Sequence, residues 1–382
     1  MGVQKQYYED CHLKTFSSVV TGCTQTEQGY WITLKATAFY PEGGGQPCDL
    51  GTLNNARVLD VQESEDQILH LCDRPLIVGA EVNGVIDWQR RFDLMQQHSG
   101  EHIVSGIIHR LFGLHNTGFH IGAELVTIDF DGILTQDDLA RVEQEANRFV
   151  WDNVPVRVWT PSPEQLPAVS YRSKKALPWP VRIVEIPGAD TCACCGIHVA
   201  STGEIGLIKL FSCVKFHQGV RIEMACGNRA LTILNRAFDQ NRQVSQAFSA
   251  KIEETGAAAR RMNEMLAEEK FRSTGLEKRL FAAIAASFSE KGNVFYQEEG
   301  LTPGSVRALA DAIGNTCGGI AAVVSGSSFC LVSKSGDTTA LGKEITAQLG
   351  GRGGGKPGCF QGSIPCSAED VLAFFRSKNF TF

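Results

Sequence analysis

The chain has 382 residues, of which 43% are hydrophobic and 20% are charged, so it can bury ordinary cores over two or three domains. This composition excludes an intrinsically disordered or fibrous chain, and no apolar run reaches the ~18 residues that a membrane span needs. The net charge of -6 argues against a polyanionic partner, although basic residues slightly outnumber acidic ones after residue 225. Thirteen cysteines, without an N-terminal signal core, favour a reducing cytoplasmic location.

Residues 1–88 are predicted to form a small β-barrel or sandwich. Short β-branched and apolar runs alternate there with turn-rich segments, as in small antiparallel domains. The predicted strands are Phe16–Val20, Tyr30–Ala36, Ala56–Val61, Gln67–Leu71 and Glu81–Ile86. The glycine-rich segment Pro41–Pro47 lacks the spacing of a phosphate-binding P-loop. It is either a tight bend or a loop that faces a ligand.

Residues 89–224 are predicted to form an α+β domain. From Trp88 the apolar residues recur with a helical period, and Gly113 is a suitable residue to end this helix. A second amphipathic helix is predicted at Gln136–Val150. The predicted strands are Val126–Phe130, Val156–Trp159, Val181–Ile186 and Ile205–Lys215.

Residues 225–290 are predicted to be a helical segment, because residues 228–288 contain no proline. Its apolar positions follow a loose 3–4 spacing at Ile252, Ala259, Met262 and Leu266. Gly256 and Gly275 are expected to interrupt a single rigid rod. The pattern indicates a coiled coil or helical hairpin that acts as a spacer or dimerises the chain, so we expect a homodimer.

Residues 291–382 are predicted to form a C-terminal α/β domain. Its predicted strands are Ile320–Val324 and Ser328–Val332, and its predicted helices are Val306–Ile313, Ala340–Leu349 and Ala368–Arg376. The glycine-rich stretch 350–358 is expected to be a loop between the last two helices. Its backbone N–H groups, together with Arg352 and Lys356, would suit a phosphate group. The alternative is a linker with no binding role.

Two pairs of potential metal ligands stand out. His98 and His102 are four residues apart on a predicted helix, so their imidazoles lie on one face about one turn apart. Cys194 and His198 repeat this spacing in a turn-rich segment. Together they offer three imidazoles and one thiolate, a donor set that suits Zn²⁺.

The coordination leaves two questions open. Cys192 and Cys195 are close enough to Cys194 to compete as the thiolate ligand, although we interpret both as structural or spare thiols. Four tight protein ligands would close the site, whereas a catalytic ion keeps a position for water or substrate. The ligand count by itself therefore does not distinguish a structural ion from a catalytic one.

The two pairs together resemble the editing domain of alanyl-tRNA synthetase and its free-standing relatives, the AlaX proteins. The interval from His102 to Cys194 fits that family, in which His-x-x-x-His precedes Cys-x-x-x-His. Thr37–Pro47 is similar to the family's glycine-rich signature, and His198–Gly206 is similar to the end of its second motif. Residues 350–358 resemble the C-terminal domain of alanyl-tRNA synthetase. No counterpart of the aminoacylation domain is recognised, so the chain looks like the long, free-standing form.

This resemblance implies an α+β multidomain enzyme with a small N-terminal β-barrel, a zinc-containing editing domain, a helical linker and a C-terminal α/β domain. The implied reaction is hydrolysis of the ester of tRNA(Ala) mischarged with serine or glycine, and neither DNA nor a membrane is an expected partner. His98, His102, Cys194 and His198 are the implied zinc ligands. Zinc would polarise the ester carbonyl or lower the pKa of a bound water.

Further site residues are expected around this centre. Glu101 is either a solvent-facing residue of the helix or, as the candidate catalytic residue, a general base that activates water. The candidate substrate-binding residues are Gly43, Gly44, Gly45, Gln46, Gly118 and His120, and the candidate tRNA-binding residues are Arg352 and Lys356. The family usually has Gly-Gly-Thr between its Cys and His, whereas this chain has Cys195-Gly196-Ile197. This departure leaves the amino-acid preference open.

Two other functions are consistent with the same residues. His98-x-x-Glu101-His102 matches the short motif of inverzincin metallopeptidases, with Glu101 as the base. That class takes an acidic third ligand downstream, whereas Cys194 and His198 are the well-placed groups here. Alternatively, the four side chains form a closed structural zinc site in a tRNA-binding adaptor.

Overall fold

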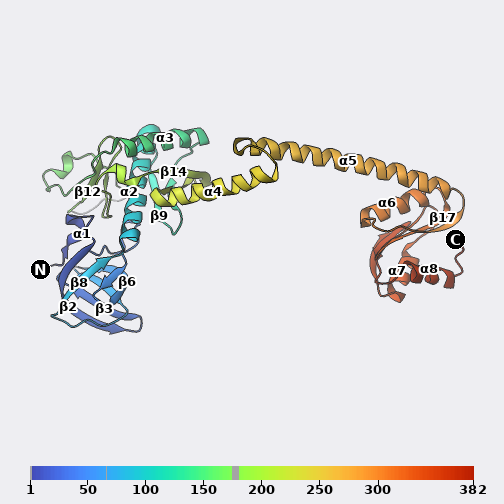
Figure 1. Cartoon of the computed structure of the whole chain (residues 1–382), viewed down its shortest axis with the longest axis horizontal. Helices are drawn as coiled ribbons and strands as arrows, with labels where there is room; N and C mark the ends of the chain where they lie inside the picture. Colours follow the sequence, from blue (N-terminus) through green and yellow to red (C-terminus); the bar gives the residue numbers. More distant parts are fainter. Residues whose placement is uncertain (1, 66, 174–179) are drawn as a thin grey trace. The chain divides into compact units, whose positions relative to one another are not determined.

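The computed structural model describes residues 2–65, 67–173 and 180–382, and it divides into two compact units, Met1–Arg242 and Gln243–Phe382 (Figure 1). Each unit combines helices with sheets, so the predicted α+β multidomain class is confirmed. Among the described residues, no helix is both long and apolar enough to cross a membrane.

The N-terminal strands close into a barrel in the order β2-β3-β7-β6-β5-β8. Their bounds are β2 Thr15–Thr26, β3 Gly29–Leu34, β5 Gly51–Leu53, β6 Ala56–Ser64, β7 Gln67–Cys72 and β8 Glu81–Ile86. Along β8 every second residue is buried, which is the alternation that fills a small barrel with side chains. Before the barrel, β1 (Gln4–Lys5) pairs with β4 (Ala36–Thr37), and α1 spans Gln6–Glu9.

The second part of this unit is built around α2 (Trp88–Phe112). Asp87 caps its first turn by accepting a hydrogen bond from the Arg90 backbone N–H, and Gly113 ends it in the left-handed conformation with φ 70°, as predicted. A sheet in the order β14-β15-β10-β9 shares one hydrophobic core with α2 and α3. The bounds are α3 Gln136–Asp152, β9 Asn116–Ile121, β10 Val126–Phe130, β14 Ile208–Phe216 and β15 Gly219–Cys226.

A smaller sheet in the order β11-β12-β13 lies beside α2. Its strands are Arg157–Trp159, Ile183–Ile186 and Asp190–Ala193, and the 3-10 turns η1 (Leu166–Ala168) and η2 (Thr202–Ile205) flank it. Gly106 of α2 permits this approach, because a Cβ there would lie 2.2 Å from the carbonyl oxygen of Ala189. The close contact places the start of β13 against the middle of α2.

Helix α2 is buried on all sides from Leu94 to Ile108. Most surface helices bury only one stripe of side chains, so this burial is unusual for a helix that contains so many polar residues. Its buried polar side chains are Gln96, Gln97, His98, Ser99, Glu101, His102 and Ser105. Buried polar groups are costly unless they are hydrogen-bonded, so each of these side chains needs a partner from another element.

The helical segment is two helices, α4 (Gly227–Ala247) and α5 (Thr255–Ser287), with the short turn η3 (Ile252–Glu254) between them. The predicted interruption at Gly256 and Gly275 is wrong, because both glycines lie within α5. The helix breaks instead near Ser249, whose φ is 50°.

The C-terminal sheet has the order β16-β17-β18-β20-β19. Its strands are β16 Gly292–Gln297, β17 Gly318–Ser325, β18 Ser328–Ser333, β19 Arg352–Lys356 and β20 Cys359–Ser363, and its helices are α6 Pro303–Gly314, α7 Thr339–Gln348 and α8 Ala368–Ser377. Alternate residues of β17 belong to two cores, one shared with α6 and the end of α5, the other with α7 and α8. The sheet is therefore covered on both faces.

The glycine-rich stretch 350–358 is not a loop, so that prediction is wrong. Residues Arg352–Lys356 form β19, the edge strand, in antiparallel register with β20. Close packing requires the glycine at position 355, since a Cβ there would lie 2.2 Å from the carbonyl oxygen of Cys359, whereas a Cβ on Gly354 would meet no atom within 4 Å. Arg352 and Lys356 end up exposed at opposite ends of the strand.

A fully buried ion pair fastens α2 to the barrel side of this unit. Neither Arg91 nor Asp49 exposes any of its side chain, and the Nε and Nη2 atoms of Arg91 donate to the two carboxylate oxygens over 2.8 and 2.5 Å. Arg91 Nη2 also donates to the carbonyl oxygen of Ala38, and the backbone N–H of Tyr40 donates to Asp49. All three guanidinium nitrogens of Arg91 and both carboxylate oxygens of Asp49 therefore form hydrogen bonds.

Replacing Arg91 by methionine should destabilise the N-terminal unit by about 3–5 kcal/mol, because Asp49 would remain buried without its counter-charge. Urea unfolding followed by circular dichroism measures this change. The control is Arg57→Met, which breaks a surface pair with Asp73 and should shift the midpoint little. Equal shifts for the two variants would contradict the role of the buried pair.

Candidate metal centre

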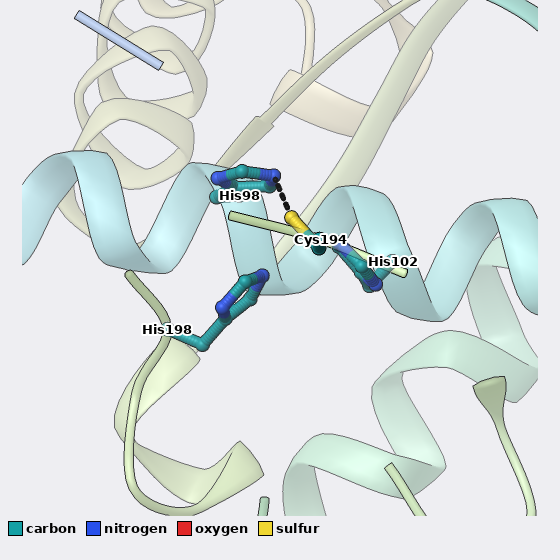
Figure 2. Close-up of side chains that lie close together, drawn as sticks. All are labelled: His98, His102, Cys194 and His198. Atoms are coloured by element: carbon teal, nitrogen blue, oxygen red, sulfur yellow. Dashed lines mark hydrogen bonds between the residues drawn. The ribbon is translucent and has the colours of Figure 1, made fainter. Parts of the chain in front are cut away.

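The four predicted ligands come together at the centre of the N-terminal unit. The donor atoms of His98, His102, Cys194 and His198 all lie within 4.8 Å of one another (Figure 2). The Sγ atom of Cys194 is 3.4 Å from Nε2 of His98, and the ring of His198 is 4.6 and 4.7 Å from those of His98 and His102 between centroids. Two side chains come from α2 and two from the segment that follows β13.

The segment that carries Cys194 and His198 is held in place by Arg182 and Tyr8. Arg182 donates two hydrogen bonds of 2.9 Å to the carbonyl oxygens of Cys194 and Gly196, and its guanidinium lies 4.5 Å from the centre of the Tyr8 ring. The Tyr8 hydroxyl donates to the carbonyl oxygen of Cys195. These contacts fix the backbone that points the thiol and the imidazole inward.

Gly196 is required by the close approach of this segment to α2. A Cβ at this position would lie 2.1 Å from the His98 ring, so a larger residue would push the Cys194 segment away from the helix. Within the sequence Cys195-Gly196-Ile197, the glycine is thus explained by packing. The side chain of Ile197 is buried in the core that α2 shares.

Hydrogen bonds from outside the centre orient the two histidines of α2. The Nδ1 atom of His98 lies 2.8 Å from the Gln46 side-chain oxygen, and Nδ1 of His102 lies 3.0 Å from a carboxylate oxygen of Asp190. Arg172 donates two further hydrogen bonds to Asp190, of 2.7 and 2.8 Å. With Nδ1 engaged in each ring, Nε2 is the nitrogen available to a metal, as in many metal sites.

The protonation of Cys194 and His198 also fits a cation. Burial by itself raises the pKa of the Cys194 thiol, but the neighbouring His98 and His198 and the hydrogen bond with His102 outweigh it, so the pKa lies well below its ordinary value. Burial lowers the pKa of His198 to about 3, so this ring stays neutral. A thiolate and a neutral imidazole are the forms that bind metal ions. At His102 burial lowers the pKa, but the hydrogen bonds with Asp190 and Cys194 outweigh it and raise the pKa well above its ordinary value, so this ring must lose a proton when a metal ion binds.

His198 gives the clearest sign of a missing partner. Both of its ring nitrogens are buried, and within residues 2–65, 67–173 and 180–382 neither has a hydrogen-bond partner. Buried nitrogens of this kind are costly, and a metal ion would satisfy one of them. The donor set and the orphaned nitrogens therefore fit a metal ion at this position.

The centre opens into a cleft of about 800 Å³. The lining residues include Gly44, Gly45, His98, Glu101, His102, Asn116, Phe119, Arg172, Cys192 and Cys194. Cys192 also forms a donor group with His102 and Asp190, but Asp190 is already bound by Arg172. Among the groups of metal donors in the described residues, only His98, His102, Cys194 and His198 supply four ligands.

The structure brings only some of the predicted substrate-binding residues to this cleft. Gly44 and Gly45 line it, and Gly45 packs against Phe119 with a φ of 82°. Gln46 lies behind the centre, where its side-chain oxygen also accepts a hydrogen bond from the Ile197 backbone N–H. Gly43, Gly118 and His120 are not among the lining residues described, and their binding role stays a prediction.

Glu101 lies in the cleft and is only 5% exposed. Its Oε1 atom accepts hydrogen bonds of 2.6 Å from both Ser105 and Asn116. It belongs to none of the metal-donor clusters found in the described residues. Asn116, Asp190 and Arg172 were not identified from the sequence. Asn116 and Arg172 are far from the ligands in the chain, and the interval of four from Asp190 to Cys194 does not by itself indicate a contact with His102.

The sequence is similar to alanyl-tRNA editing proteins and to parts of tRNA synthetases. The family model for the threonyl and alanyl tRNA synthetase second additional domain matches residues 181–223, and the model for class II (A) tRNA synthetases matches residues 6–90. The alanyl-tRNA editing protein Aarsd1 of Mus musculus is 29% identical over 381 residues, which cover 92% of each chain. The Danio rerio protein of the same name is 27% identical over 98% of each chain.

A full-length ligase is also similar. The alanine--tRNA ligase of Pyrococcus abyssi is 30% identical over 382 residues, which cover 94% of this chain and 41% of the ligase. The similarity to the editing proteins, by contrast, extends over nearly the whole of both sequences.

Replacing Cys194 by alanine should lower the bound zinc to well below one ion per chain, because the thiolate is the anionic donor of the cluster. Elemental analysis after dialysis against a zinc buffer measures the content. Cys195→Ala is the matched control, since this neighbouring cysteine is exposed and outside the cluster. Full zinc occupancy in Cys194→Ala would contradict the assignment.

Proposed function

Because this chain is a homologue of the alanyl-tRNA editing proteins over most of its length, we propose that it is a trans-editing aminoacyl-tRNA hydrolase. Its substrate is tRNA(Ala) that carries serine or glycine, and the reaction cleaves the ester to free amino acid and tRNA. The observation that carries this proposal is the cluster of His98, His102, Cys194 and His198 at the wall of a cleft. We take Zn²⁺ as its ion, because three imidazoles and a thiolate are typical zinc donors.

The residues around the cluster have separate tasks in this mechanism. When bound, zinc supplies Lewis acidity toward an ester carbonyl or a water molecule. Gln46 and Asp190 hold the two rings of α2, and Arg172 holds Asp190, so the donors need little rearrangement. Gly44 and Gly45 line the cleft, and the missing side chain of Gly45 lets Phe119 pack against this loop, because a Cβ there would lie 2.6 Å from the Phe119 ring. An activated ester needs less assistance than a peptide bond, so positioning contributes much of the acceleration.

The first test compares Ser-tRNA(Ala) with Ala-tRNA(Ala) as substrates of the purified protein. We expect the serine ester to be hydrolysed and the alanine ester to be spared, because an editing site must reject the correct amino acid. Release of the labelled amino acid is measured over time at equal tRNA concentrations.

The other outcomes of this test point to other functions. Saturable tRNA binding without loss of either ester, in protein with zinc bound, would contradict the proposal and favour a structural-zinc adaptor. Cleavage of peptides that Glu101→Gln abolishes and Cys194→Ala spares would favour a metallopeptidase.

The C-terminal sheet is our proposed contact for the tRNA backbone. Edge strand β19 exposes Arg352 and Lys356 at its two ends. In an edge strand, every second backbone N–H faces away from the neighbouring strand, so glycines without side chains leave these donors open to phosphate oxygens. A strand thus takes over the phosphate-binding role that the sequence suggested for a loop.

Replacing both Arg352 and Lys356 by alanine should weaken tRNA binding, and the slope of log affinity against log salt should fall by about one for each lost phosphate contact. Filter binding at several salt concentrations measures both. The control is Lys291→Ala, just before β16 at the opposite edge of the sheet. Unchanged affinity in the double variant would remove β19 from the tRNA contacts.

We also propose a homodimer that forms through α5. This helix exposes large apolar side chains at Met262, Met265, Leu266, Phe271, Leu276 and Leu280. All of them except Phe271 lie on one face of the helix at 100° per residue, and the same face of a second copy would cover them.

A further inference from the structure

Glu101 is a buried carboxylate in the cleft that forms no ion pair with a described residue, although the Arg172 guanidinium is close enough to interact with it electrostatically. Glu101 itself is 5% exposed. The nearby cation Arg172 is bound through two nitrogens to Asp190. Taking a carboxylate out of water without a paired cation is costly, so the site is better satisfied once a cation enters the cleft.

Asn116 of β9 offers a second unsatisfied acceptor next to Glu101. Its side chain is 8% exposed, and its Nδ2 atom donates to Glu101 over 2.6 Å and to Ser105 over 3.0 Å. Because a carboxylate only accepts hydrogen bonds, the amide nitrogen must face Glu101, which leaves Oδ1 on the other side. Within the described chain, this buried Oδ1 accepts no hydrogen bond.

These two residues lie beside the metal cluster. Glu101 immediately precedes His102 and follows His98 by three residues on α2, and all three side chains line the same cleft. Asn116 reaches the cleft from β9. An ester carbonyl held at the cluster would therefore have Glu101 and Asn116 along the adjoining wall.

We propose that Glu101 and Asn116 bind the α-ammonium group of the aminoacyl ester. The ammonium carries one positive charge and three N–H donors, and it is attached to the carbon next to the ester carbonyl. It therefore supplies a paired counter-charge to Glu101 and a donor to Asn116 Oδ1. This inference rests on the proposed hydrolase function. It replaces the general-base role predicted for Glu101 with that of a specificity-determining contact.

A consequence is selection for a free amino group. In peptidyl-tRNA the same nitrogen is an amide, which carries no charge and has one N–H donor. Such a substrate would leave the Glu101 carboxylate buried and unpaired, so the site would disfavour it. The cleft would thus distinguish mischarged tRNA from tRNA that carries a growing chain.

The test compares two substrates that differ only at the α position. One is Ser-tRNA(Ala), and the other is its 2-hydroxy-acid analogue, in which a neutral hydroxyl replaces the ammonium. We expect kcat/KM of the wild-type protein to be roughly 10- to 100-fold higher for the seryl ester, as for loss of one charged hydrogen bond. Glu101→Gln should lower kcat/KM for the seryl ester by about the same factor and change hydrolysis of the analogue little.

Each outcome separates this inference from the proposed function. Equal loss of both esters in Glu101→Gln would indicate a general base and overturn the ammonium contact, while the hydrolase function stands. Equal rates for the seryl ester and its hydroxy-acid analogue in the wild-type protein would also overturn the ammonium contact, and this result needs no variant. Hydrolysis of neither ester by the wild type would overturn the function and the inference together.

The control variant is Glu124→Gln, which removes the same charge from an exposed position after β9. It should retain the wild-type preference for the seryl ester. Zinc content and the unfolding midpoint of Glu101→Gln should match those of the wild type, because neither metal donation nor an ion pair is lost. A preference for the seryl ester that survives in Glu101→Gln, with zinc and fold intact, would also overturn the proposal.

Discussion

The buried pair of Arg91 and Asp49 is the constraint on which the rest of the N-terminal unit depends. It joins the first turn of α2 to the chain segment between β4 and β5, in surroundings that exclude water. A buried ion pair contributes little net stability by itself. Removing only one of its two partners is strongly destabilising, because the other charge stays buried without a partner. Because Asp49 follows Gln46 by three residues, the pair also sets the distance between Gln46 and His98.

The metal cluster follows from the same arrangement. Helix α2 carries two of the four candidate ligands with helical spacing, and the segment after β13 brings the other two across it. Close packing at Gly106 and Gly196 is what allows that approach. The same packing places Asp190 at His102, so the orienting carboxylate and the thiolate ligand arrive on one strand and the residue after it. The same packing contacts therefore position both the candidate ligands and the side chains that orient them.

Because α2 is buried on all sides, each of its polar side chains should have a hydrogen-bond or ionic partner, and one without such a partner indicates a binding role. Gln97 is paired with backbone groups of β15, and His98 and His102 have partners on one ring nitrogen. Glu101 differs, because its hydrogen bonds come from the neutral donors Ser105 and Asn116 and it forms no ion pair with a described residue. In a site whose substrate is cationic next to the reacting bond, such a group has a direct use. In the mechanism that we propose, the cluster and Glu101 would recognise adjacent atoms of one substrate.

The sequence by itself determined most element types, the four candidate ligands and the resemblance to the alanyl-tRNA editing proteins. Periodicity and spacing are local properties, so Trp88–Phe112 and His98-x-x-x-His102 could be read directly. The partners Asp190, Asn116 and Gln46 were decided by tertiary structure, since they lie outside α2 and no spacing pairs them with the α2 residues that they contact. Likewise, residues 352–356 have the composition of a loop, and only pairing with β20 makes them a strand. The backbone hydrogen bonds of this local hairpin, whose second strand also pairs with β18, outweigh the conformational freedom of glycine there.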